Sequence, residues 1–255
     1  MALFRGTVRS KVLDMDTVVN VVVPYDIMAR DTNPPENDKV LYLLHGRRQN
    51  ADSWSRMSGV ERYARKNGFT VVMPEVQHSY YSDMAYGLRY FEYVSKELPE
   101  LMNAMFRFPQ GREHTFVGGL SMGGFGAAKC ALNNPGAYAG VMCFSSGVYI
   151  LDNMKKFVES GAFAVREGEA ILGEGYPVAG TENDLDMLME RWPADVEKPR
   201  FYLSCGTEDG LLPLTRKLHA ALMKNGFDST EEEWSGNHDW DFWDASLRKG
   251  MAFMK

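Results

Sequence analysis

The stretch HTFVGGLSMGGFGAA, residues 114–128, places one serine among glycines, between a short apolar run and a segment of small residues. Within it, a G-x-S-x-G pentapeptide is formed by Gly119, Leu120, Ser121, Met122 and Gly123. In this motif the serine sits on a tight strand-to-helix turn that lifts its hydroxyl into the open. Side chains two residues before and after the serine would collide there, and glycine removes their Cβ atoms. The motif therefore predicts a nucleophilic Ser121.

The flanking residues agree with such a turn. Residues 115–117 are β-prone and end in glycine, whereas residues 125–132 are rich in Ala and Leu and stop at Asn133, Asn134 and Pro135. That order predicts a strand, a turn and a helix. A glycine-rich turn that merely packs tightly is the structural alternative. A phosphate-binding loop is disfavoured, because neither G-x-G-x-x-G nor a loop ending in Gly-Lys-Ser/Thr can be laid over these residues.

Length and composition are typical of a globular protein. The chain has 255 residues, enough for a single α/β domain over residues 1–255, and no composition shift marks a second one. The net charge of -6 gives no electrostatic footprint for nucleic acid, so no nucleic-acid partner is expected. No apolar run approaches membrane-spanning length, so no membrane partner is expected either.

The cysteines and the N-terminal residues indicate in which cellular compartment the protein is expected. Residues 1–16 alternate apolar and polar side chains and lack the apolar region of a signal peptide. Cys130, Cys143 and Cys205 lie in apolar segments, at spacings that match neither zinc ligands nor a redox pair. We expect reduced core thiols and a cytoplasmic protein, although leaderless export stays open. A monomer and a homo-oligomer are both compatible with the sequence.

Periodicity divides the chain into strands and helices. Residues 3–13 and 17–25 alternate with period two around a turn at residues 14–16, which predicts an antiparallel hairpin at a sheet edge. A polar loop with Asn33, Pro34 and Pro35 follows. Short apolar runs then predict buried parallel strands at residues 40–44, 70–73, 115–117, 141–144 and 201–205. Helices are expected near residues 60–67, 84–105, 124–132 and 214–225. The alternation predicts an α/β fold with a doubly wound, mostly parallel sheet.

Residues 149–192 interrupt this alternation with scattered glycines and charges but no strong strand. We interpret them as an insertion of short helices that caps the site and shapes the acyl pocket. The alternative is a segment that only covers a sheet edge. Met187, Leu188 and Met189 are interpreted as packing residues, not as part of a cofactor site.

A serine hydroxyl needs a base to take its proton and an acid to orient that base. The chain contains five histidines. His45 and His78 follow strands upstream of Ser121, His114 opens the strand before it, and His219 lies inside a predicted helix. In α/β-hydrolases the triad follows the chain order Ser, acid, His. The order favours His238, in the loop SGNHDW, as the base; a solvated turn residue is the alternative.

The acid is expected at the end of the strand 201–205, which leads into Glu208 and Asp209. Asp209 is the preferred acid, with Glu208 as its competitor and two ordinary loop carboxylates as the structural alternative. Three further carboxylates follow His238 in sequence and are expected to start the last helix, where negative charge suits the helix dipole: Asp239, Asp241 and Asp244.

Negative charge that builds on the ester oxygen needs an oxyanion hole. One expected donor is the backbone N–H of Met122. The second normally comes from the loop after the third strand, where LYLLHG ends in Gly46, so the backbone N–H of Arg47 is its candidate. The side chains of Arg47 and Arg48 are expected to be solvated charges, or else to meet an anionic part of the substrate.

Together these segments resemble the esterase D-like esterases, and within them the tributyrin esterase group. LYLLHG with Trp54 downstream, GGLSMGGFGA, CGTED and GNHDWDFW occur in the family's order over nearly the whole chain. The resemblance implies an α/β-hydrolase fold and no metal or organic cofactor. It also implies the same site residues: a triad of Ser121, Asp209 and His238, with oxyanion donors at Arg47 and Met122. The Arg47-Arg48 pair departs from the smaller or apolar residues of many members.

The expected activity is that of a serine carboxylesterase acting on small-molecule esters. Short acyl groups, acetyl or similar, on sugars or phenolic acids are the expected substrates, and an acyl-enzyme resolved by water is the expected route. Acyl transfer to an alcohol with the same triad is one alternative. A non-catalytic binding module on the hydrolase scaffold is the other.

Overall fold

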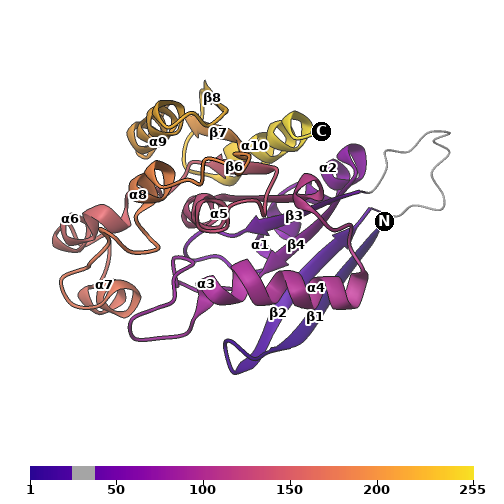
Figure 1. Ribbon diagram of the computed structural model, residues 1–255, viewed down its shortest axis with the longest axis horizontal. Coiled ribbons are helices and arrows are strands. Elements are labelled where there is room, and N and C mark those ends of the chain that lie inside the picture. Colours follow the sequence, from indigo (N-terminus) through magenta and orange to yellow (C-terminus); the bar gives the residue numbers. More distant parts are fainter. Residues whose placement is uncertain (25–37) are drawn as a thin grey trace.

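The computed structural model describes residues 1–24 and 38–255, and its centre is an eight-stranded sheet with helices on both faces (Figure 1). The strands lie in the order β1-β2-β4-β3-β5-β6-β7-β8. Their bounds are β1 Ala2–Ser10, β2 Met15–Val23, β3 Lys39–Leu44, β4 Phe69–Pro74, β5 Thr115–Leu120, β6 Gly140–Phe144, β7 Arg200–Gly206 and β8 Ser229–Trp234. The pairs β1–β2 and β2–β4 are antiparallel, and all others are parallel. The predicted doubly wound, mostly parallel sheet is confirmed.

The predicted N-terminal hairpin is confirmed, with a shorter first strand than expected. β1 ends at Ser10, which pairs with Met15. The turn closes early because the Glu97 carboxylate accepts hydrogen bonds from Ser10 Oγ and from the Lys11 N–H, at 2.6 Å for the latter. Tyr25, at the end of the predicted second strand, and the predicted polar loop with Asn33, Pro34 and Pro35 lie outside the described residues.

The central strands are buried on both faces. Along β3, Val40, Tyr42 and Leu44 belong to one apolar cluster, while Leu41 and Leu43 belong to another on the opposite face. Successive side chains of a strand point to opposite faces, so a strand covered on both sides needs a continuous apolar run. This explains why the runs at 40–44, 70–73, 115–117, 141–144 and 201–205 were recognisable as strands.

One edge strand, β8, has no such run and was not predicted. Its sequence STEEEW contains three consecutive glutamates. Glu232 accepts from Lys249 Nζ at 2.6 Å and from Tyr202 Oη at 3.1 Å, and Glu233 accepts from both nitrogens of the Arg216 fork at 2.6 Å. Side chains from neighbouring elements thus bind two of the three glutamates whose charges hid the strand in the sequence.

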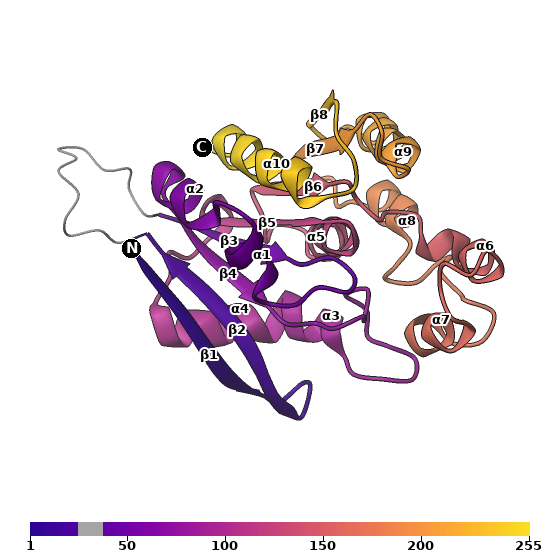
Figure 2. The same ribbon diagram turned by 180° about the vertical axis from the view of Figure 1, so that it is seen from behind.

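Two helical layers cover the sheet, as the front and rear views show (Figure 1; Figure 2). The helices α1 Ser53–Met57, α2 Val60–Asn67 and α10 Trp240–Phe253 contribute to one apolar cluster. The other cluster includes residues of α3 Tyr90–Glu92, the π-helical segment Tyr93–Glu97, α4 Leu98–Phe106, α5 Met122–Asn133 and α9 Leu212–Lys224. The predicted last helix is α10, and Asp239 is its N-cap, accepting from the Phe242 N–H at 3.1 Å.

The prediction of a helix beginning at residue 84 was wrong, because the helical run begins at Tyr90. The N–H groups of Ala85 and Tyr86 instead donate to the carbonyls of Ile171 and Ala170, at 3.2 and 3.0 Å. These tertiary hydrogen bonds hold residues 85–86 in a loop although the side chains are compatible with a helix.

The predicted insertion of short helices lies between β6 and β7. It contains the 3-10 turn Leu151–Asn153 and the helices α6 Met154–Glu159, α7 Val165–Leu172 and α8 Leu185–Glu190. Lys129 of α5, fully buried, joins it to the core by donating to the Glu182 and Asn183 side chains at 2.8 and 2.7 Å. Met189 is buried, as expected for a packing residue. We call residues 149–192 the cap.

The three cysteines are buried free thiols, as predicted. Within residues 1–24 and 38–255, no helix combines the length and apolar character needed to cross a membrane. In the same described residues, no cluster of three or more His, Cys, Asp or Glu side chains is arranged to hold a metal ion.

Candidate active site

Ser121 lies at the centre of the sheet, at the turn between β5 and α5. Its backbone has φ 52° and ψ −116°, a conformation that costs a non-glycine residue about 1–3 kcal/mol. Backbone hydrogen bonds from outside the turn help to hold it there: the Ser121 N–H donates to the Phe144 carbonyl at 2.9 Å, and the Gly147 N–H donates to the Ser121 carbonyl at 2.8 Å. The strand order changes direction beside β5, which is where α/β sheets bind their ligands.

The glycines of the pentapeptide are required by close approach of the backbone. A Cβ on Gly119 would lie 2.6 Å from the Gly123 carbonyl carbon and 2.7 Å from the Leu44 oxygen. A Cβ on Gly123 would in turn collide with the Leu44 carbonyl. The absence of these atoms lets α5 start directly against β3 and β5, which presents the serine at the carboxyl ends of the strands.

His238 bridges Ser121 and Asp209. Its Nε2 lies 3.1 Å from Ser121 Oγ, and its Nδ1 lies 2.8 Å from Asp209 Oδ2. An ionised carboxylate can only accept, so Nδ1 carries the proton and Nε2 is left to accept from the serine hydroxyl. The Trp243 and His238 rings pack at right angles to each other, with centroids 4.9 Å apart. The structure therefore brings the three predicted triad residues together.

Asp209 is buried and ionised. Its residue exposure is 4%, and its Oδ1 accepts from the Leu211 N–H at 2.9 Å. Burial raises the pKa of this carboxyl, but the hydrogen bonds from His238 and Leu211 outweigh burial and hold the pKa below its ordinary value. The carboxylate thus keeps its charge opposite the imidazole.

Glu208, the alternative candidate for the orienting acid, makes different contacts. Its carboxylate accepts from the Gly236 N–H at 2.5 Å and from Thr207 Oγ1 at 2.9 Å, and its own N–H donates to the Gly236 carbonyl. The first of these hydrogen bonds is the largest cause of a lowered Glu208 pKa. Glu208 therefore secures the loop that carries His238, and it is Asp209 that contacts the imidazole.

The other histidines have partners away from the serine. His114 Nδ1 lies 2.8 Å from the Asp38 carbonyl, and His219 Nδ1 lies 2.9 Å from Ser229 Oγ. His78 is half exposed, with Nδ1 3.7 Å from Glu167. His45 is buried beside the loop after β3.

Both predicted oxyanion donors lie where the strands around Ser121 end. The Met122 N–H is at the first position of α5, where a helix provides no internal acceptor. Arg47 follows β3 in the turn 46–49, in which the Gln49 N–H donates to the Gly46 carbonyl at 3.3 Å. The Gly46 N–H donates to Gln49 Oε1 at 2.9 Å, and the next N–H, that of Arg47, is the candidate donor of this turn.

The expectation that the Arg47 side chain is a solvated charge was wrong. Its guanidinium binds both oxygens of Glu167 on α7, at 2.8 and 2.6 Å, and donates to the Ala162 carbonyl at 3.1 Å. The group also lies over the Phe163 ring, 3.8 Å from its centroid. Arg48, by contrast, is exposed and has φ 65°. Arg47 thus links the turn 46–49 to the cap.

Gly147 and Tyr80 lie near the serine but belong to no motif recognised in the sequence. A Cβ on Gly147 would lie 3.3 Å from the Ser121 carbonyl carbon, 3.1 Å from the Tyr80 hydroxyl and 3.3 Å from Ile150 Cδ1. Tyr80 is buried and packs against Phe163 of the cap, with ring centroids 5.9 Å apart. The side of Ser121 near Gly147 is therefore bounded by an aromatic hydroxyl and an aliphatic side chain.

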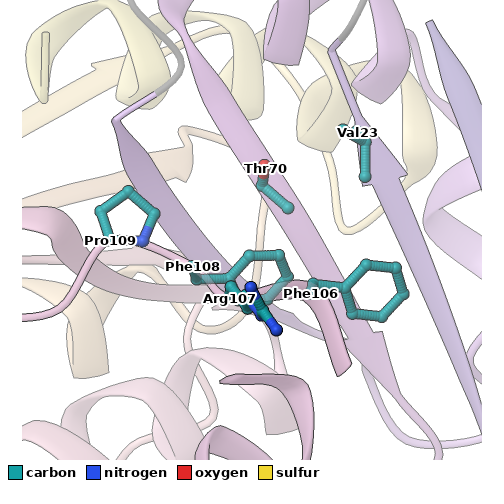
Figure 3. A pocket seen from close by; sticks show the side chains of 6 residues that line it. All are labelled: Val23, Thr70, Phe106, Arg107, Phe108 and Pro109. Atoms are coloured by element: carbon teal, nitrogen blue, oxygen red, sulfur yellow. The ribbon is translucent and has the colours of Figure 1, made fainter. Parts of the chain in front are cut away.

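A separate pocket of about 390 Å³ lies at the opposite end of the sheet (Figure 3). Its lining residues are Val23, Thr70, Phe106, Arg107, Phe108 and Pro109. Thr70 is at the amino end of β4, whereas Ser121 follows the carboxyl end of the parallel strand β5. The pocket is therefore not part of the site around Ser121.

Comparison with known proteins identifies the family. The family model described as "Putative esterase" matches residues 10–254. An acetyl esterase of Caldicellulosiruptor saccharolyticus is 30% identical over 262 residues, which covers 100% of this chain and 98% of the relative.

Solved structures give the same answer. FphF, a fluorophosphonate-binding serine hydrolase of Staphylococcus aureus, superposes with a TM-score of 0.88 at 29% identity, covering 99% of this chain and 98% of that one. An S-formylglutathione hydrolase of the same organism, FrmB, has a TM-score of 0.85 at 29% identity, with the same coverage. A ferulic acid esterase at 22% identity, with a TM-score of 0.77, supports the fold alone. The chain therefore belongs to the esterase family of that model, has the α/β-hydrolase fold, and is a carboxylic ester hydrolase of the serine type.

Proposed function

We propose that this protein hydrolyses short-chain acyl esters of small molecules through an acyl-enzyme, with Ser121, His238 and Asp209 as its catalytic triad. The observation that carries the proposal is the continuous relay from Asp209 through His238 to Ser121, with contacts of 2.8 and 3.1 Å. Both contacts lie within the distances at which a base can take a proton from a nucleophile.

In the first half of the reaction, Ser121 Oγ forms a bond to the ester carbonyl carbon while its proton passes to His238 Nε2. The carbonyl electron pair moves to oxygen, where the backbone N–H groups of Met122 and Arg47 stabilise the negative charge. The bond to the alcohol oxygen then breaks, and the proton on Nε2 passes to that oxygen. Asp209 stabilises the imidazolium that forms between these steps.

In the second half, water replaces the alcohol. The water oxygen bonds to the acyl carbon while His238 Nε2 takes a proton from that water. The bond between the acyl carbon and Ser121 Oγ then breaks, and the proton on Nε2 passes to Ser121 Oγ as the acid leaves. Membership of the esterase family argues against the alternative of a non-catalytic binding module, because the family and the relative are named as esterases.

The name of a relative supports a short acyl group. A protein that aligns with 100% of this chain at 30% identity is named an acetyl esterase.

The test compares the wild type, Ser121→Ala and the control Ser55→Ala on p-nitrophenyl acetate. Ser55 is a half-buried serine of α1 whose hydroxyl contacts Met73 Sδ at 3.7 Å. We expect Ser121→Ala to lose kcat by roughly 10⁵-fold or more and Ser55→Ala to remain near the wild type. A fluorophosphonate should label the wild type at Ser121. Equal turnover by the wild type and Ser121→Ala would disprove the assignment.

A series of acetyl, butyryl and octanoyl esters tests the acyl preference separately. We expect kcat/KM to decline beyond the short chains. Added alcohol should leave the rate of acid release unchanged if water is the true acceptor, and capture of the acyl group by the alcohol in preference to water would identify a transferase.

A further inference from the structure

The Gly46–Arg47 peptide group is held from its carbonyl side. The Gly46 oxygen lies 2.8 Å from His45 Nδ1 and accepts from the Gln49 N–H at 3.3 Å. A trans peptide is planar, so its C=O and N–H point in opposite directions. Binding the carbonyl therefore also sets the direction of the Arg47 N–H, which is the second oxyanion donor of the proposed reaction.

The hydrogen bonds of His45 define its protonation. A carbonyl can only accept, so Nδ1 must carry a hydrogen toward Gly46. On the other side of the ring, the Val76 N–H donates to Nε2 at 3.2 Å, so Nε2 must be unprotonated. These two contacts fit the Nδ1–H form of the imidazole. Glu75 Oε1, 3.6 Å from Nε2, already accepts from the Gln77 N–H at 2.8 Å.

The surroundings leave the ring and its backbone little freedom. His45 is 1% exposed, and its carbonyl accepts from the Tyr81 hydroxyl at 2.9 Å. The preceding carbonyl, of Leu44, accepts from Trp54 Nε1 at 3.1 Å. A ring fixed at both nitrogens, on a backbone fixed at both neighbouring carbonyls, makes a rigid support for the Gly46 oxygen.

We propose that His45 is a positioning residue of the reaction: its Nδ1–H holds the Gly46 carbonyl and thereby aims the Arg47 N–H at the oxyanion. This inference rests on the proposed esterase mechanism. It assigns a role to the one histidine next to the site that the triad does not use, and it makes that role depend on one ring nitrogen.

Two substitutions separate the two ring nitrogens. The amide nitrogen of His45→Asn stands near the place of Nδ1 and can still donate to Gly46, while the contact to Val76 is lost. The amide oxygen of His45→Gln stands near the place of Nε2 and can still accept from Val76, while the donor to Gly46 is lost. Each variant removes one of the two hydrogen bonds and keeps the other.

We expect His45→Asn to keep kcat within about threefold of the wild type on p-nitrophenyl acetate, and His45→Gln to lose kcat by roughly 10- to 100-fold, with KM changed by less than about threefold in both. A trifluoromethyl ketone, whose adduct with Ser121 carries an oxyanion, should bind His45→Gln more weakly by the same factor as the loss in kcat. Equal losses in the two variants, or a better Gln than Asn, would overturn the proposal.

A measurement on the wild type keeps the proposal testable if both variants fail to fold. Histidine ¹⁵N chemical shifts distinguish the Nδ1–H form, the Nε2–H form and the imidazolium, and His45 should show the Nδ1–H form at neutral pH. Either other form would refute the assigned hydrogen bond. The result does not depend on turnover, so it stands apart from a failure of the Ser121→Ala test, which would refute the esterase mechanism instead.

Discussion

The guanidinium of Arg47 binds both carboxylate oxygens of Glu167, 120 residues further along the chain, at 2.8 and 2.6 Å. Arg47 thus reaches the cap by its side chain, while its backbone N–H is the proposed second oxyanion donor. Both side chains of this pair are 19% exposed, so solvent weakens the attraction only in part. The pair fastens the start of α7 over the loop after β3.

Breaking this pair should weaken substrate binding more than it slows chemistry. His45 and the turn 46–49 hold the Arg47 N–H independently of the side chain. We therefore expect Glu167→Gln to raise KM roughly fivefold, corresponding to about 1 kcal/mol, with kcat within about twofold. Glu169→Gln, the same charge change two residues along α7, is the control. Steady-state kinetics at low and high salt make the comparison, and a fall in kcat at constant KM would contradict it.

Replacing the orienting acid should abolish most of the activity. In Asp209→Asn the amide cannot hold His238 in the form with its proton on Nδ1, so we expect kcat to fall by roughly 10³- to 10⁴-fold. Glu208→Gln should retain kcat within about tenfold, because Glu208 contacts the Gly236 backbone and not the imidazole. Comparable losses in the two variants would show that loop geometry matters more than the charge on Asp209.

The lowered pKa of Asp209 also predicts how stability depends on pH. Because the folded-state pKa lies below the unfolded value of about 3.9, the ionised carboxylate stabilises the folded chain. That contribution is fully present above the unfolded pKa and is lost as the pH falls through the folded-state pKa. The difference in melting temperature between the wild type and Asp209→Asn should be constant above about pH 5 and shrink below about pH 4. A difference that grows on acidification would exclude this linkage.

A methyl group at Gly123 should destabilise the fold. Its position would overlap the Leu44 carbonyl, which is backbone and cannot rotate away. We expect Gly123→Ala to lose about 1–3 kcal/mol of the free energy of unfolding, and activity with it. Gly210→Ala is the control, since a Cβ there would meet no atom within 4 Å. Thermal denaturation of both variants provides the measurement, and equal melting temperatures would argue against the close contact.

Much of the fold could be predicted because its signals are local. The apolar runs that became β3 to β7 reflect burial on both faces. The glycines around Ser121 form a short motif, although part of the reason for them, the Leu44 carbonyl of β3, lies far away in the sequence. Prediction failed where distant contacts decide the structure. The run at 84–89 is a loop because the N–H groups of residues 85–86 donate to carbonyls of α7. β8 is a strand because it pairs with β7, while side chains elsewhere bind two of its glutamates.

The sequence by itself determined that Ser121 sits on a nucleophile turn and that His238 and a carboxylate near residue 208 follow it in order, since chain order and short motifs are properties of the chain. Only the tertiary structure decided between Asp209 and Glu208 as the residue that contacts His238. It also showed that the Arg47 side chain pairs with Glu167 and that His45 contacts the Gly46 carbonyl. The physical reason is that a hydrogen bond needs its two heavy atoms within a narrow range of about 2.7–3.2 Å, and folding alone brings these distant groups that close.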